Sequence, residues 1–159
     1  MPKRYTWRHL NNQIKEIEDE PSQAKAMSDY RCSIENRLHS QCMSIICLVR
    51  DEYLPALEAN AKKNMLQLDE KYIEERAFFY KIVGDYFRYA SEATTVPEGS
   101  SVVPSVISED LTDMDGPARK AFFKKGALDA YLKCNNISRK GLKPYNCVRL
   151  GLALNFSVF

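Results

Sequence analysis

The residues that could carry chemistry in this sequence form a row of charges within the proline-free stretch EERAFFYKIVGDYFRYASEA, residues 74–93. Positions i, i+3, i+4 and i+7 fall on one side of a helix. This spacing is shared by Lys81, Gly84, Asp85 and Arg88. One interpretation is a rigid cationic surface, with Tyr89 beside it, that binds an anion. The other is a solvated charged face on a core helix, which residues 74–93 alone favour.

Gly84 interrupts this row of charges. A glycine in the middle of a helix costs about 1 kcal/mol relative to alanine, so we expect another group to come close to the backbone there. A wide apolar side of the same helix, with spacings of three and four, is formed by Phe79, Ile82, Val83, Tyr86, Phe87 and Ala90. Residues 74–93 are therefore predicted to be a core helix.

The composition indicates a single helical domain over residues 1–159, long enough to bury a core. The net charge is +2 and no Lys/Arg run occurs, so we expect no nucleic-acid partner. No apolar run approaches the roughly 20 residues of a membrane span, and the N-terminus lacks the apolar segment of a secretory signal. We therefore expect no membrane association.

The cysteines and histidines give no pattern for a disulfide framework or a metal site. The five cysteines include no CxxC, and the only histidines are His9 and His39. Small buried thiols in a reducing cytoplasm account for such usage. The sequence contains no P-loop, no GxGxxG and no set of nucleophile, acid and base. We predict a cytoplasmic protein that is not an enzyme and has no cofactor.

The other elements follow from apolar periodicity and from the positions of proline and glycine. Helices are predicted over residues 3–17 and 22–53, with Pro55 ending the second, and residues 58–71 are predicted to be a connection with at most one helical turn. Residues 94–117 hold three prolines and two glycines and are predicted to be a flexible loop. Because no segment alternates with period two, we predict an all-α fold.

Two further helices are predicted after the loop. One begins near Pro117, with Asp113 or Asp115 near its cap, and ends at Gly141. The last begins near Asn146 and continues to the end of the chain, as RLGLALNFSVF over residues 149–159.

This last helix is apolar on two sides. Leu152, Phe156 and Phe159 can serve the core, and the second side carries Gly151, Leu154, Asn155 and Val158. A helix of this kind is normally sandwiched between neighbours. The alternative is that the second side lines a groove, where the Asn155 amide can bond the backbone of an extended peptide.

Four segments of the sequence resemble the 14-3-3 family of phosphoserine- and phosphothreonine-binding adaptors. RLGLALNFSVF (149–159) is similar to one family signature and YKIVGDYFRY (80–89) to a second. KRYTWR (3–8) and AYLKCNNIS (130–138) are weaker matches, and all four occur in family order. The resemblance implies an antiparallel helical array, here lacking the first and last helices of the family, so we expect these 159 residues to be part of a longer protein.

The resemblance assigns roles to individual residues. It implies that Arg4, Arg88 and Tyr89 bind the phosphate. It implies a peptide groove formed by Lys81, Gly151, Leu154, Asn155 and Val158. A phosphoserine carries about −1.5 to −2 charge at pH 7, and the planar fork of arginine forms bidentate bonds to its oxygens. Asp85, one turn before Arg88, is expected to orient a guanidinium.

The function implied is an adaptor that docks phosphorylated client proteins in a helical groove, as a homodimer or heterodimer. His9 and Gln13 stand where the family has aliphatic dimer contacts. The alternative is a degenerate helical scaffold that mediates phosphorylation-independent interactions. The two hypotheses differ in whether Arg4, Arg88 and Tyr89 converge on one point.

Overall fold

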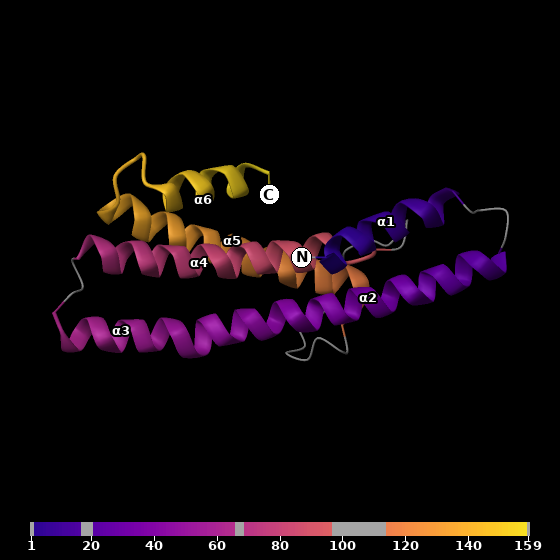
Figure 1. Ribbon diagram of the computed structural model, residues 1–159, viewed down its shortest axis with the longest axis horizontal. Coiled ribbons are helices and arrows are strands. Elements are labelled where there is room, and N and C mark those ends of the chain that lie inside the picture. Colours follow the sequence, from indigo (N-terminus) through magenta and orange to yellow (C-terminus); the bar gives the residue numbers. More distant parts are fainter. Residues whose placement is uncertain (1, 17–20, 66–68, 97–113, 159) are drawn as a thin grey trace.

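The computed structural model describes residues 2–16, 21–65, 69–96 and 114–158. Within these ranges every regular element is a helix, in agreement with the predicted all-α fold (Figure 1). The elements are α1 (Pro2–Glu16), α2 (Pro21–Cys47), the π-helix η1 (Leu48–Tyr53), α3 (Leu54–Lys63), α4 (Glu70–Glu92), α5 (Gly116–Gly141) and α6 (Cys147–Ser157).

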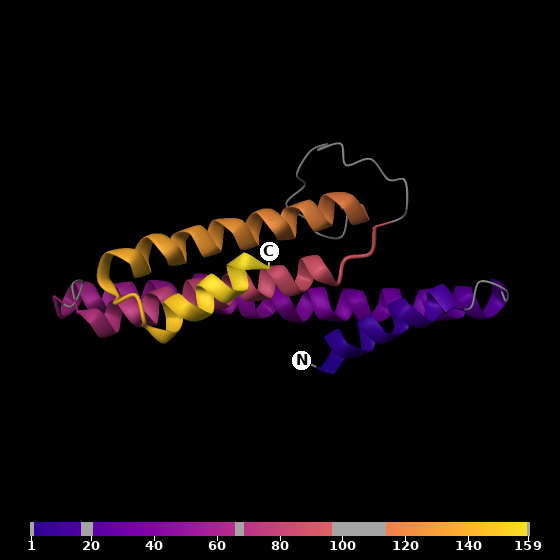
Figure 2. The ribbon, with the colours of Figure 1, turned by 90° about the horizontal axis from the view of Figure 1, so that it is seen from above.

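The helices form the antiparallel array that the resemblance implies. Successive elements run in opposite directions, in the order α1, the continuous α2–η1–α3 rod, α4, α5 and α6 (Figures 1 and 2). Helix α4 is central: it packs against α2, α3, α5 and α6, and most extensively against α5. Helix α1 packs mainly against α2.

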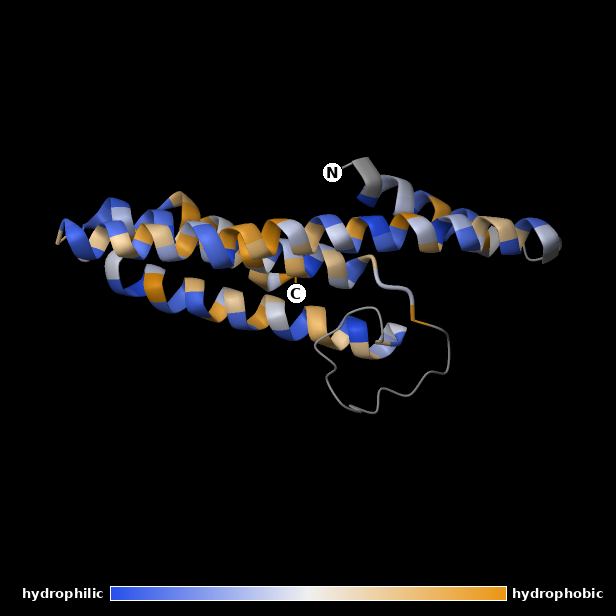
Figure 3. Cartoon of the chain, turned by 90° about the horizontal axis from the view of Figure 1, so that it is seen from below, coloured by the Kyte–Doolittle hydropathy of each residue, from blue (hydrophilic) through white to orange (hydrophobic). Residues whose placement is uncertain are grey.

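The core lies where α2, α4 and α5 meet. Its fully buried side chains include Leu38, Cys42, Ile46, Ala77, Ala90, Phe123, Tyr131 and Cys134. Burying one large apolar side chain contributes about 1.5–3 kcal/mol. Apolar and polar residues alternate along the helices in Figure 3, and no helix of the described residues is long and apolar enough to cross a membrane.

Helix α4 is buried on its charged side as well as on its apolar side. Gly84, Asp85 and Arg88 are all buried, so of the two interpretations the solvated charged face is wrong. The physical reason is that α5 covers this side and supplies Tyr131, which is fully buried. A Cβ placed on Gly84 would lie 2.5 Å from Cδ1 and Cε1 of the Tyr131 ring, which confirms that a neighbour comes close to the backbone here.

Pro55 does not end the second helix, so that prediction is wrong. The turn before it is π-helical, and the Leu54 N–H bonds to the carbonyl oxygen of Val49. Pro55 then occupies the first turn of α3, where no intrahelical N–H is required. The wider π turn accommodates the proline without a break in the helix. The helix continues to Lys63, so the prediction that residues 58–63 belong to a connection is wrong.

Most other boundaries agree with the predictions. Side chains cap α5 and α6: the Ala118 N–H donates to Asp115 at 2.8 Å, and the Val148 N–H to Asn146 at 2.8 Å. Helix α4 begins at Glu70, earlier than predicted, because the Asp69 side chain accepts from the Tyr72 N–H. Residues 97–113 of the predicted loop lie outside the described residues, and residues 94–96 and 114–115 are not helical.

The cysteines are only partly the buried thiols that we expect. Cys42 and Cys134 are buried, and burial raises the pKa of these thiols to about 11 and about 12. Cys32 and Cys147 are exposed, so the expectation is wrong for both. Each lies on a helix face that no described element covers.

His39 is a buried titratable group between α2 and α4. Its Nε2 lies 3.1 Å from the Ala90 carbonyl oxygen and 3.1 Å from Oγ1 of Thr94. A carbonyl oxygen can only accept, so we assign the proton to Nε2. Burial lowers the pKa of His39 to about 4, and the bond to Ala90 opposes that shift only in part. His39 is therefore neutral at pH 7.

The pKa of His39 makes stability depend on pH. Because the folded-state pKa lies below the unfolded value, the unfolded chain takes up the proton first as the pH falls. We expect the free energy of unfolding to decrease between pH 6.5 and about 4 by up to about 3 kcal/mol from this residue. Urea denaturation across this range should give a shallower slope for His39→Gln than for the control His9→Gln, whose position is exposed. Equal slopes for the two variants would contradict the assignment.

The close contact at Gly84 predicts that a methyl group there is destabilising. Gly84→Ala should lower the free energy of unfolding by about 1–3 kcal/mol, because overpacking against Tyr131 outweighs the gain in helix propensity. Urea denaturation measures the effect.

Gly151→Ala is the matched control for this substitution. A Cβ there would meet only the flexible end of Lys81, whose Cε lies 3.1 Å away, and the stability should change little. A Gly84→Ala protein as stable as the wild type would show that the Tyr131 ring is not confined.

Candidate functional site

Three guanidinium groups from two helices meet at one carboxylate, that of Glu92. Oε2 of Glu92 accepts from Nε of Arg4 at 3.1 Å, from Nη2 of Arg4, and from Nη2 of Arg8 at 2.9 Å. Oε1 accepts from Nη1 of Arg88 at 2.6 Å. Arg4 and Arg8 are one turn apart on α1, and Arg88 and Glu92 are one turn apart on α4. The ends of these helices therefore carry one shared charge cluster.

The Tyr89 ring contacts both of the arginines that the resemblance assigns to the phosphate. The Cζ atoms of Arg4 and Arg88 lie 4.3 Å and 4.7 Å from the centroid of its ring, within the range of a cation–π interaction. Its hydroxyl makes no hydrogen bond to another residue that the structure describes. The structure thus brings Arg4, Arg88 and Tyr89 together at one place.

The cluster carries more positive than negative charge. Burial by itself would raise the pKa of Glu92, but the hydrogen bonds and charges of Arg4 and Arg88 hold it below its usual value. Burial opposes the charge on Arg88, and the bond to Tyr131 and the charge of Glu92 raise its pKa above the usual value. Three guanidinium groups against one carboxylate leave a net charge of about +2, which suits an anionic ligand.

Arg88 is held in place at both ends of its guanidinium. Its Nε donates to the Tyr131 hydroxyl at 3.2 Å, and that hydroxyl donates to Oδ1 of Asp85 at 2.7 Å. The direct distance from Nη2 of Arg88 to Oδ1 of Asp85 is 4.0 Å. Asp85 therefore orients the guanidinium through Tyr131 rather than by direct contact. Burial raises the pKa of Tyr131 far above its usual value, so the phenol remains a donor.

Asp85 also organises the predicted peptide groove. Its carboxylate accepts from Nζ of Lys81 at 2.7 Å and from Nδ2 of Asn155 at 2.7 Å. The Asn155 amide is therefore bonded within the chain through its nitrogen. Its side-chain oxygen accepts no hydrogen bond from the described part of the chain. Gly151 lies against Lys81, so α4 and α6 meet at these polar residues.

The apolar groove residues of α6 are open to solvent. Leu154 is 69% exposed and Val158 is 71% exposed, so nothing in the described ranges covers them. Val158 also borders a hollow of about 170 Å³ that adjoins the charge cluster. Its other lining residues are Arg88, Ser91, Glu92, Lys120 and Lys124. The exposed side of α6 therefore leads to the arginines.

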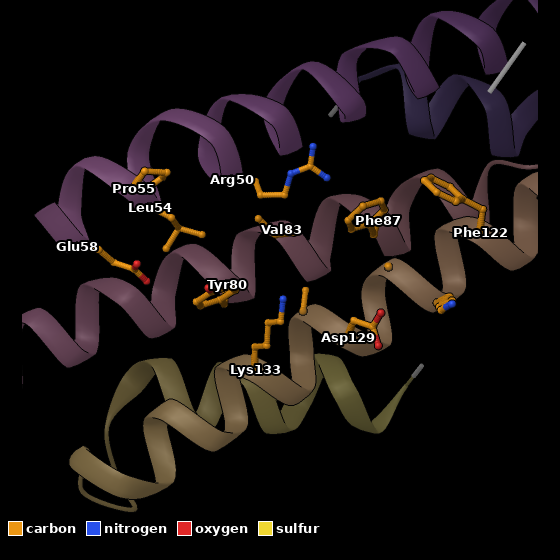
Figure 4. A pocket seen from close by; sticks show the side chains of 13 residues that line it. Arg50, Leu54, Pro55, Glu58, Tyr80, Val83, Phe87, Phe122, Asp129 and Lys133 are labelled. Atoms are coloured by element: carbon orange, nitrogen blue, oxygen red, sulfur yellow. The ribbon is translucent and has the colours of Figure 1, made fainter. Parts of the chain in front are cut away.

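A separate pocket of about 450 Å³ lies between the α3 end of the long rod, α4 and α5 (Figure 4). It has an apolar floor that includes Val83 and Phe87, and a rim with charges of both signs. On this rim Arg50 is paired with Asp51 at 2.7 Å. No predicted site residue lines this pocket, and its polar groups do not point to one centre, so we do not place the site there.

Sequence reasoning missed Arg8, Glu92 and Tyr131. A signal for the first two exists, because Arg4 and Arg8, and likewise Arg88 and Glu92, are spaced i, i+4 and share a helix face. That the two faces meet could not be read from either helix. Tyr131 gave no signal of a polar role, since its neighbours along α5 fit an apolar core.

Comparisons with known proteins agree with the resemblance. The model of the family described as 14-3-3 protein matches residues 1–107. The chain is 29% identical over 157 residues to "14-3-3 protein theta" of Mus musculus, covering 99% of this chain and 50% of that protein. It is 30% identical over 159 residues to "14-3-3-like protein GF14 epsilon" of Arabidopsis thaliana, covering 99% and 49%. The chain spans about half the length of these curated relatives.

The bonds of Tyr131 predict that its hydroxyl stabilises the fold. Tyr131→Phe removes the acceptor of Nε of the buried Arg88 and one donor to Asp85. We expect the free energy of unfolding to fall by about 1–3 kcal/mol, measured by urea denaturation.

Tyr53→Phe is the matched control, because Tyr53 is 52% exposed on η1. It should change stability by less than about 0.5 kcal/mol. If Tyr131→Phe has as little effect as the control, the hydroxyl does not hold Arg88.

Proposed function

Because the chain belongs to the 14-3-3 family, we propose that it is an adaptor that binds client proteins phosphorylated on serine or threonine. The family consists of non-enzymatic adaptors. The observation that carries the proposal is the convergence of Arg4, Arg88 and Tyr89 at the ends of α1 and α4. A degenerate scaffold has no need for this convergence, so the second hypothesis is the less well supported.

The chemistry of the cluster suits a phosphate monoester. Arg4 and Arg88 each have N–H groups beyond those bonded to Glu92 and Tyr131, and the Tyr89 hydroxyl adds a neutral donor. The oxygens of a phosphate dianion accept several such bonds at once. Tyr131 and Glu92 fix the plane of Arg88 in advance, which lowers the entropy lost on binding.

The rest of the client would lie along α6. The free side-chain oxygen of Asn155 can accept from the backbone of an extended peptide, while Leu154 and Val158 offer exposed apolar surface for its side chains. Lys81, beside Gly151, can meet an acidic group of the client. Binding in this way clamps or masks the client without changing it chemically.

Two features of the family remain predictions for this chain. Family members dimerise, and we propose pairing with a second copy or a related chain. A cytoplasmic location is the other prediction.

The proposal predicts binding that depends on the phosphate. Isothermal titration with a phosphoserine peptide and its unphosphorylated twin should show tight binding of the first only. Equal weak binding of both would exclude the adaptor function. Arg88→Ala should weaken binding of the phosphopeptide by about 30- to 100-fold, the value of a lost charge-assisted bidentate contact.

Two variants sharpen the test of Arg88. Arg88→Lys keeps the charge but loses the fork, so its affinity should fall between those of the wild type and Arg88→Ala. Arg37→Ala removes the same charge from an exposed site on α2 and should leave affinity unchanged. Circular dichroism confirms that each variant is folded. Unchanged affinity in Arg88→Ala would remove Arg88 from the site.

A further inference from the structure

Glu92 occupies the position at which the proposed phosphate-binding arginines converge. Its carboxylate accepts from Arg4, Arg8 and Arg88, and its side chain is 31% exposed. Glu92 is thus more exposed than Arg4 and Arg88, whose side chains are 23% and 10% exposed, so an anion that approaches from solvent can reach the same hydrogen-bond donors. A carboxylate offers the same planar, bidentate acceptor geometry to arginine as two oxygens of a phosphate.

The Glu92 carboxylate reduces the repulsion between the neighbouring arginines when no ligand is bound. Arg4 and Arg8 come from α1, and their hydrogen bonds to α4 are accepted by Glu92. Arg88, on α4 itself, donates to the same carboxylate. Lys120 and Lys124 line the adjoining hollow and form no ion pair with residues in the described ranges. Without Glu92, the five cations Arg4, Arg8, Arg88, Lys120 and Lys124 would lie near one another with Asp85, 4.0 Å from Arg88, as the nearby carboxylate.

We propose that Glu92 is a built-in placeholder for the phosphate, which neutralises the arginines in the free protein and yields part of their hydrogen bonds to an incoming phosphate. The inference rests on the proposed function and assigns a regulatory role to a residue outside the predicted phosphate-binding set. The carboxylate stabilises the free state and repels the ligand in the bound state. Glu92 therefore lowers the affinity of the site for phosphate while it assembles the site.

The two effects are thermodynamically linked. A group that stabilises the free protein more than the complex must weaken binding by the difference. Glu92→Gln keeps the shape and one acceptor oxygen, so the arginines can still gather, but removes the negative charge. The variant should be less heat-stable than the wild type without ligand, and should recover more stability when phosphate is added.

Inorganic phosphate is the first probe, because it does not depend on any peptide contact. Thermal unfolding is followed at increasing phosphate and constant ionic strength for the wild type and Glu92→Gln. We expect the variant to bind phosphate about tenfold more tightly or better, the size of effect that one unscreened charge at contact distance produces. Affinity equal to or below that of the wild type would overturn the placeholder role and show that Glu92 only positions the arginines.

Two variants act as controls. Glu75→Gln removes the same charge from an exposed position on the same helix and should leave phosphate affinity unchanged. Glu92→Asp keeps the charge and should stay closer to the wild type than Glu92→Gln does. An equal gain in Glu75→Gln would overturn the proposal, because net charge alone would then explain the effect.

A measurement on the wild-type protein tests the inference even if Glu92→Gln does not fold. The carbon-13 carboxyl signal of Glu92 should shift as inorganic phosphate saturates the site, since its arginine bonds are exchanged. An unmoved Glu92 signal, while the Arg88 side-chain signals move, would overturn the exchange.

A phosphoserine peptide then separates the two proposals. If the wild type does not distinguish it from the unphosphorylated twin, the proposed function fails, whatever inorganic phosphate does. If the wild type distinguishes them and Glu92→Gln does not bind the phosphopeptide more tightly, the placeholder role alone fails.

Discussion

The burial of one arginine on the central helix constrains most of this structure. Arg88 is 9% exposed, and an unpaired buried guanidinium would cost several kcal/mol. Its partners come from different parts of the chain: Glu92 on its own helix, and Tyr131 on α5. Tyr131 is bonded in turn to Asp85, which binds Asn155 of α6. Satisfying one charge therefore aligns α4, α5 and α6.

The same requirement explains the glycine within the charged row. Tyr131 can reach Asp85 and Arg88 only if its ring passes close to the α4 backbone, where a Cβ on residue 84 would lie 2.5 Å away. Glycine at position 84 thus lowers the helix propensity but permits the contact with Tyr131, whose hydroxyl bonds the buried Asp85 and Arg88. The polar network runs through the interior of the array, so the packing and the proposed site share the same residues.

The proposed ligand site consists of two parts whose cations come from different helices. A rigid part, Arg88 between Tyr131 and Glu92, is built on the central helix. A second part, Arg4 and Arg8, comes from α1, which packs mainly against α2 and contacts α4 at Glu92 and Tyr89. An anion that binds both parts would therefore stabilise the approach of two helices. Client binding would in this way be coupled to the position of α1.

Local sequence determined most of the helices of this protein, together with several of their ends. Asp115 and Asn146 cap α5 and α6 because short polar side chains bond free N–H groups of the first turn. The spacing of Lys81, Asp85 and Arg88 placed them on one face, and the family resemblance placed Arg4 and Tyr89 beside them. Tertiary structure alone decided that this face is buried, that the turn before Pro55 widens so that the helix continues, and that Glu92 and Arg8 complete the cluster. Helical periodicity predicts which residues share a face of a helix. Which element packs against that face depends on contacts between segments far apart in the chain.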